Sequence, residues 1–124
     1  MTEPLALVFY EKLLPGSQVV NRLQDLKYRV ETISDPSRLV ECAQQCLPMI
    51  VLLDLESAQD NVCAAITRLR QTPTTNHLPI IAFSSERTVS LQEAAKAAGV
   101  TLAVSDTAIL SHLPQFLEQA LQLD

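Results

Sequence analysis

Two polar residues, Asp54 and Ser84, each end a short run of apolar residues. Residues 50–53 read Ile-Val-Leu-Leu before Asp54, and residues 80–83 read Ile-Ile-Ala-Phe before Ser84. Short apolar runs bounded by polar residues are typical of strands that are buried on both faces of a parallel sheet. Ligands of open parallel α/β sheets bind at the carboxyl ends of the strands. We therefore expect Asp54 and Ser84 to meet at the sheet edge where chemistry takes place.

Three further polar residues should reach the same edge. Tyr10 and Glu11 follow the apolar run 5–9, and Asp106 follows the run 100–104. Carboxylates supply the oxygen ligands that Mg²⁺ prefers, and one or two are enough because the ion keeps several waters. A small metal-dependent α/β enzyme that uses Glu11, Asp54 and Asp106 is thus one hypothesis. The sequence shows no nucleophile–base pair to support it.

The elements that would position these residues alternate along the chain. Apolar runs predict strands at 5–9, 28–33, 50–54, 78–83 and 100–104. Pro15 and Gly16 are expected to break the chain after the first strand. Helical spacing of apolar residues then predicts helices at about 19–26, 36–46, 58–70, 89–98 and 111–121. Asp35 is expected to cap the second helix, Gly99 to end the fourth, and residues 108–110 to lie in a loop. Such alternation predicts a parallel sheet with helices on both faces.

Composition excludes several function classes. The chain has 124 residues, 48% of them apolar, and a net charge of -5 with mixed signs, which predicts one domain over residues 1–124 and no nucleic-acid partner. No apolar run is long enough to span a membrane. Three cysteines and an N-terminus without signal-peptide features predict reduced thiols and a cytoplasmic location. The two glycines leave no phosphate-binding glycine loop.

The chain resembles the receiver domain of two-component response regulators over almost its whole length. The motifs that carry the resemblance are Ile-Val-Leu-Leu-Asp-Leu at 50–55, Leu-Pro-Ile-Ile-Ala-Phe-Ser at 78–84 and Ala-Ala-Gly at 97–99. The separation of the first two also fits. The resemblance implies a flavodoxin-like α/β fold, (βα)5 and doubly wound, whose five-stranded parallel sheet has the order 2-1-3-4-5.

The resemblance also implies roles for individual residues. Asp54 occupies the position of the phospho-accepting aspartate, and Ser84 that of the hydroxyl residue that contacts the phosphoryl group. Glu11 matches the second member of the acidic pair that holds Mg²⁺, and the backbone carbonyl of Glu56 matches the main-chain metal ligand. With these ligands, any Mg²⁺ site is expected to be weak.

Several positions depart from the family pattern. Tyr10 replaces the first acidic residue, and Asp106 replaces the lysine that holds a phosphoryl oxygen. Ala103 replaces the switch aromatic, while Thr107 and Ala58 replace prolines. Two carboxylates about 5 Å apart at an effective dielectric near 20 repel by about 3 kcal/mol. Asp106 must therefore turn to solvent, for instance as a cap of the following turn, or the site must disfavour phosphorylation.

The preferred interpretation is a pseudo-receiver, a non-enzymatic signalling domain that acts by protein–protein interaction. The alternative is a working receiver that takes a phosphoryl group on Asp54 from a histidine kinase. The partner would be such a kinase or a downstream signalling protein, or a second copy of the chain. We expect the contact surface on the fourth helix, fifth strand and fifth helix, at Ala95, Ala98, Ala103, Ile109 and Leu110.

Overall fold

Five strands form one sheet, and every pairing is parallel. The computed structural model describes residues 4–10, 13–35, 38–56, 62–85 and 89–122. The strands are β1 (Leu5–Phe9), β2 (Arg29–Ile33), β3 (Ile50–Asp54), β4 (Ile80–Ser84) and β5 (Leu102–Ser105). Their order in the sheet is β2-β1-β3-β4-β5. The predicted fold class and strand order are confirmed.

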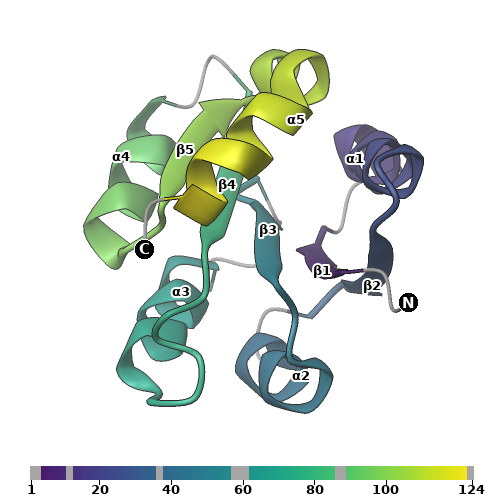
Figure 1. The fold of residues 1–124 in the computed structure, drawn as a ribbon. Coiled ribbons are helices and arrows are strands. Elements are labelled where there is room, and N and C mark those ends of the chain that lie inside the picture. The colour runs from purple at the N-terminus through teal and green to yellow at the C-terminus, as the bar shows by residue number, and fades with distance from the viewer. Residues whose placement is uncertain (1–3, 11–12, 36–37, 57–61, 86–88, 123–124) are drawn as a thin grey trace.

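Helices cover both faces of this sheet (Figure 1). They are α1 (Leu13–Asp25), α2 (Leu39–Cys46), α3 (Val62–Gln71), α4 (Val89–Ala98) and α5 (Asp106–Gln122). α1 and α5 lie on one face, and α2, α3 and α4 lie on the other. Among the described residues, no helix has both the length and the apolar character to cross a membrane.

The two faces of β3 supply the two halves of the hydrophobic core. Val51 and Leu53 pack with residues of α2, α3 and α4, whereas Ile50 and Leu52 pack with residues of α1 and α5. Successive side chains of a strand point to opposite faces, so a strand covered on both sides is apolar throughout. All five residues of β3, including Asp54, are buried. Asp54 is therefore held by a rigid central strand.

The fifth helix begins earlier than predicted. α5 starts at Asp106, directly after β5, so residues 108–110 are helical and do not form a loop. Its cap is Ser105, whose Oγ accepts the backbone N–H of Ala108 at 3.1 Å. The helix has a kink at His112, where φ is -127° and ψ is 27°. The start predicted near residue 111 is the start of the segment beyond this kink.

Two other helix ends test the local sequence signals. Gly99 ends α4 as predicted, with a φ of +118° and with the backbone N–H of Val100 bound to the carbonyl of Ala95 at 3.2 Å. α2 begins at Leu39, later than predicted, and its N-cap residue is Arg38, so Asp35 is not the cap. The carbonyl of Asp35 instead accepts the backbone N–H of Arg38 at 3.1 Å. Residues 58–61, predicted to begin the third helix, lie outside the described residues.

Arg70, at the end of α3, connects two loops at the amino-terminal edge of the sheet. Its Nε donates to the carbonyl of Gly99 at 2.7 Å, and Nη1 donates to the carbonyls of Asn76 at 2.8 Å and Leu78 at 2.7 Å. Nη2 reaches Thr101 Oγ1 at 3.3 Å. Partial burial lowers the pKa of the guanidinium from its ordinary value. This residue stabilises the edge opposite the candidate site.

Candidate functional site

The strand registers bring Tyr10, Asp54, Ser84 and Asp106 to one edge of the sheet. These residues stand at or directly after the carboxyl ends of β1, β3, β4 and β5. The paired positions are Phe9 with Leu53, Asp54 with Phe83, and Ser84 with Ser105. Neighbouring strands lie about 4.8 Å apart, so the four ends form a continuous row. Glu11, the predicted metal ligand, lies outside the described residues.

Asp54 is the most deeply placed carboxylate of this row. Its side chain is 1% exposed, and its Oδ2 atom is hidden from solvent. Its Oδ1 atom accepts the backbone N–H of Glu56 at 2.9 Å. A carboxylate that bonds to the backbone two residues ahead stabilises a turn, and this turn begins where β3 ends. The geometry of the Asp54 carboxylate is thus fixed by its own loop.

The side chain of Glu56 has a role that the sequence did not indicate. Its Oε2 atom accepts the backbone N–H of Ser85 at 2.5 Å. This bond joins the loop after β3 to the loop after β4, next to Asp54 and Ser84. The predicted role of Glu56 concerned only its backbone carbonyl. No spacing rule links a residue of one loop to the backbone of another, so tertiary structure alone reveals the bond.

Ser84 is completely buried, and its hydroxyl is engaged. Its Oγ atom accepts a hydrogen bond from Gln92 Nε2 of α4 at 3.1 Å and donates to the carbonyl of Ser85 at 3.4 Å. A hydroxyl has one donor hydrogen and two acceptor lone pairs. A phosphoryl oxygen at Asp54 would have to displace the long Ser85 contact to receive that hydrogen. Gln92 is a second contributor to the site that the sequence analysis missed.

The side chain of Tyr10 packs directly against Gly16 of α1. A Cβ atom on Gly16 would lie 2.3 Å from Cγ and Cδ2 of the tyrosine ring and 2.7 Å from its Cβ. The ring is partly buried against the core on the α1 and α5 face. Gly16 is therefore a helical residue that admits the ring, and it does not break the chain as the sequence suggested. A packed phenol thus stands where the resemblance implies an acidic metal ligand.

Asp106 remains at the site edge because it opens α5. The residue is half-buried, and its Oδ1 atom is hidden from solvent. Asp106 was expected either to turn to solvent or to disfavour phosphorylation, and this oxygen does not face solvent. The free N–H groups and the dipole of a helix N-terminus stabilise a carboxylate in the first turn by about 0.3–1 kcal/mol. Ser105, and not Asp106, serves as the cap.

The donor set fits Mg²⁺ only in part. Asp54 offers a carboxylate and Glu56 a backbone carbonyl, and Tyr10 offers no carboxylate where the family has one. Within the described ranges, no group of three or more His, Cys, Asp or Glu residues is arranged to hold a metal ion. Mg²⁺ requires oxygen ligands in near-octahedral geometry, and the loss of its bound waters is energetically costly.

The predicted contact surface needs correction. Ala95 and Ile109 are completely buried and belong to the core, so neither is available to a partner. Ala95 packs in the core that α4 shares with β4, and Ile109 packs against β4 on the opposite face because α5 begins at Asp106. Ala98, Ala103 and Leu110 are half-buried. The early start of α5 thus converts an expected apolar loop into a packed helix.

Solved structures with the same fold include response regulators and a receiver domain. A response regulator of Chloroflexus aurantiacus has a TM-score of 0.88 at 18% identity, over 97% of this chain and 98% of that chain. The chemotaxis response regulator CheY4 of Vibrio cholerae has a TM-score of 0.82 at 20% identity, over 96% and 99%. The receiver domain of the Pseudomonas aeruginosa sensor histidine kinase PA1611, solved with magnesium in its active-site cleft, has 0.85 at 19%, over 97% and 98%.

The sequence itself is far from known families. No family model matches it. No curated protein matches it either. At these levels of identity the structural neighbours define the fold, which is that of response-regulator receiver domains.

Proposed function

We propose that the chain is a single receiver-fold domain, residues 1–124, that signals through protein contacts and has a degenerate phospho-acceptor site. The observation that carries this proposal is the carboxylate of Asp106. It stands where the resemblance places a lysine, with one oxygen hidden from solvent. Its charge is thus opposite to the charge that a phosphorylated Asp54 needs nearby. The proposed domain has no enzymatic activity of its own.

The size of the electrostatic effect supports this interpretation. β4 lies between β3 and β5, so the two strand ends are about 10 Å apart. A phosphoryl group adds about -1.5 to -2 charges. At an effective dielectric near 20 its repulsion from Asp106 amounts to about 3 kcal/mol over that distance. A lysine at the same position would contribute an attraction of similar size.

Other residues of the site favour the same conclusion. Tyr10 packs on Gly16 and supplies no metal ligand. The Ser84 hydroxyl already bonds to Gln92 and Ser85. Ala103 has no rotamers with which to report phosphorylation. Binding of Mg²⁺ by Asp54, Glu56 and Glu11 is proposed to be weak. The proposed partner is a histidine kinase, a downstream signalling protein or a second copy of the chain.

Phosphorylation of the purified protein tests this proposal. We expect incubation with acetyl phosphate and Mg²⁺ to leave the intact mass of nearly all molecules unchanged. Asp54→Asn is the matched control because it removes the acceptor and nearly preserves the side-chain shape. Stoichiometric gain of one phosphoryl group that is absent from Asp54→Asn would overturn the degenerate site.

The second candidate is a functional receiver that is phosphorylated by a histidine kinase. It is favoured by the placement of Asp54 and Ser84 at adjacent strand ends. A titration with beryllofluoride and Mg²⁺ separates the candidates, because this phosphoryl analogue would bind tightly only to a functional acceptor site. Nothing among the described residues supports the third hypothesis, a metal-dependent enzyme.

A further inference from the structure

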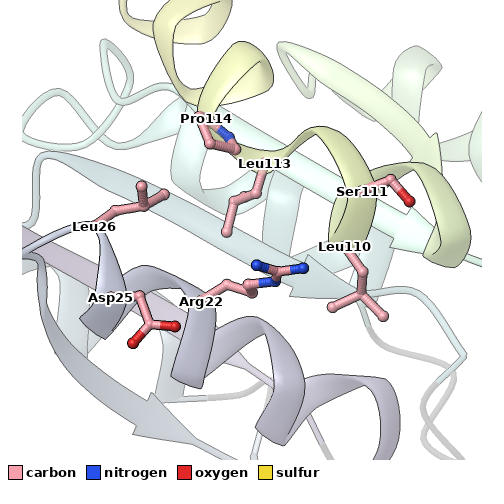
Figure 2. Close-up of a pocket in the computed structure, with 7 residues that line it drawn as sticks. All are labelled: Arg22, Asp25, Leu26, Leu110, Ser111, Leu113 and Pro114. Carbon is pink, nitrogen blue, oxygen red and sulfur yellow. The ribbon is translucent and has the colours of Figure 1, made fainter.

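A groove separates the end of α1 from the kinked part of α5 (Figure 2). Its volume is about 140 Å³. The residues that line it are Arg22, Asp25, Leu26, Leu110, Ser111, Leu113 and Pro114. Leu26 is 36% exposed. The groove lies on the helical face formed by α1 and α5. Its lining includes Leu110, one of the predicted contact residues, but no residue of α4 or β5.

The groove results from a local sequence feature. The ring of a proline inside a helix clashes with the carbonyl four residues earlier, here Leu110, and removes one helical hydrogen bond. The kink at His112, two residues before Pro114, follows from this clash. The lining of the groove lies on both sides of the kink. The shape of the groove therefore depends on Pro114 in the sequence of α5.

Charge in the groove is arranged asymmetrically. Figure 2 shows the guanidinium of Arg22 lying across the groove toward Leu110 and Leu113, whereas the carboxylate of Asp25 points away from it. Arg22 and Asp25 are the charged residues among the seven that line the groove. An incoming group therefore meets aliphatic walls and one cation.

We propose that this groove binds a protein segment that inserts one leucine- or phenylalanine-sized side chain and places a carboxylate against Arg22. A cavity of about 150 Å³ lined by aliphatic side chains accommodates benzene, so a groove of 140 Å³ suits one such side chain. Arg22 adds selectivity, because a guanidinium bonds a carboxylate in a bidentate manner. The inference rests on the proposed function and specifies the chemistry of its partner.

A small probe with the same two features tests the groove directly. Phenylpropionate carries one aromatic ring and one carboxylate, and phenethylamine carries the same ring with a cation. We expect phenylpropionate to shift the backbone NMR signals of Leu26 and Leu113 in a saturable way, and phenethylamine to leave them unchanged. Equal binding of both compounds, or shifts confined to another surface, would overturn the proposal.

Two matched variants locate the charge contact. Arg22→Glu should weaken phenylpropionate binding by about tenfold or more, a difference of 1.4 kcal/mol. Arg38→Glu makes the same charge change at an exposed residue beside α2, outside the groove, and should have no effect. An equal loss in both variants would mean that net charge, and not Arg22, governs binding.

Selection of helical peptides on the full chain extends the test to protein segments. The selected peptides should share an apolar residue with Asp or Glu about one turn away. They should compete with phenylpropionate and lose binding to Arg22→Glu. Peptides that lose binding only to Lys96→Glu would assign the contact to α4 and overturn the proposal. So would sedimentation showing that a second copy occupies the groove.

Failure of this inference is distinguishable from failure of the proposed function. Phosphorylation of Asp54 would overturn the degenerate site and leave groove binding as measured. Loss of probe and peptide binding at the groove, with Asp54 unphosphorylated, would overturn only the groove.

Discussion

Asp106 places a carboxylate at the start of α5, where the resemblance has a lysine. We predict that Asp106→Lys binds beryllofluoride and Mg²⁺ at least about tenfold more tightly than the parent protein, an effect of 1.4 kcal/mol. This is less than half of the estimated repulsion that the change removes, because the lysine is partly solvated. Isothermal titration would measure it. Thr107→Lys, at the exposed neighbouring position, is the control and should have no effect.

An unchanged affinity in Asp106→Lys would show that the site lacks more than this charge. Adding Tyr10→Asp then restores the acidic position that the resemblance assigns to Mg²⁺. If the double variant also binds no better, the residue correspondence at β1 and β5 is wrong.

Tyr10 and Gly16 form a second pair whose coupling is measurable. Gly16→Ala should destabilise the protein by about 1–3 kcal/mol, because the new methyl group overlaps the tyrosine ring. In a Tyr10→Ala background the same change should stabilise it by up to about 1 kcal/mol, since alanine is the better helix former. A urea-unfolding double-mutant cycle measures the coupling. Additive effects would contradict the packing described here.

Single residues were predictable where a strand determined their position. Asp54 and Ser84 could be placed at one edge because each ends an apolar run, and parallel strands share their carboxyl edge. The roles of Gln92 and of the Glu56 side chain could not be predicted, because their contacts join segments that only the tertiary fold brings together. The break predicted at Pro15 and Gly16 was wrong. A glycine after a proline usually indicates a helix break, and the packing of the Tyr10 ring on Gly16 is visible only in the structure.

At the scale of elements, Pro114 is expected to reduce stability. The buried residues of α5 keep regular helical spacing through the kink, so packing does not require it; they are Ile109, Leu113, Leu117 and Ala120. We predict that Pro114→Ala stabilises the protein by about 1 kcal/mol, part of the roughly 3 kcal/mol that an interior proline costs. The same variant should weaken phenylpropionate binding.

Thermal unfolding measures the change in stability, and the NMR titration measures the change in binding. Pro73→Ala, at an exposed loop position, is the control. A destabilised Pro114→Ala would show that the kink is needed for packing.

Arg70 is the element-level contact most suited to mutation. Arg70→Lys keeps the charge but loses the planar fork that binds Gly99, Asn76 and Leu78. We expect a loss of about 1–2 kcal/mol in chemical unfolding. Arg68→Lys, an exposed residue of the same helix, should change stability by less than about 0.5 kcal/mol. Equal effects of the two substitutions would remove the role assigned to Arg70.

The strands were more predictable than the helix starts. Buried strands appear as continuous apolar runs, whereas the start of a helix depends on which of several polar residues bonds to the backbone. Pro114 suggested a first turn near residue 111, but Ser105 caps α5 six residues earlier. A consequence is that Ile109→Glu, which would place a charge in the core, is expected to unfold the protein rather than probe a surface.

At the scale of the whole molecule, the candidate site lies at the carboxyl edge of the sheet, and the groove lies between α1 and α5 on one face. Strand order followed from the resemblance, because alternating strands and helices restrict the topology but do not fix which strand is central. The groove was not foreseeable from the sequence, since it depends on the angle that one proline imposes between two helices. The molecule thus has a candidate acceptor site at the sheet edge and a groove between α1 and α5.

These two regions are expected to act independently. In the proposed function no residue transmits the state of Asp54, because Ala103 cannot alternate between rotamers as a switch aromatic would. We predict that beryllofluoride with Mg²⁺ changes the affinity of the groove for phenylpropionate by less than about twofold, a coupling below about 0.4 kcal/mol. NMR titrations with and without the analogue measure this coupling, and the Asp54→Asn variant should give the same affinity. A coupling of about fivefold or more, abolished by Asp54→Asn, would show that the acceptor site controls the groove. The chain would then act as a phosphorylation-dependent receiver despite Asp106.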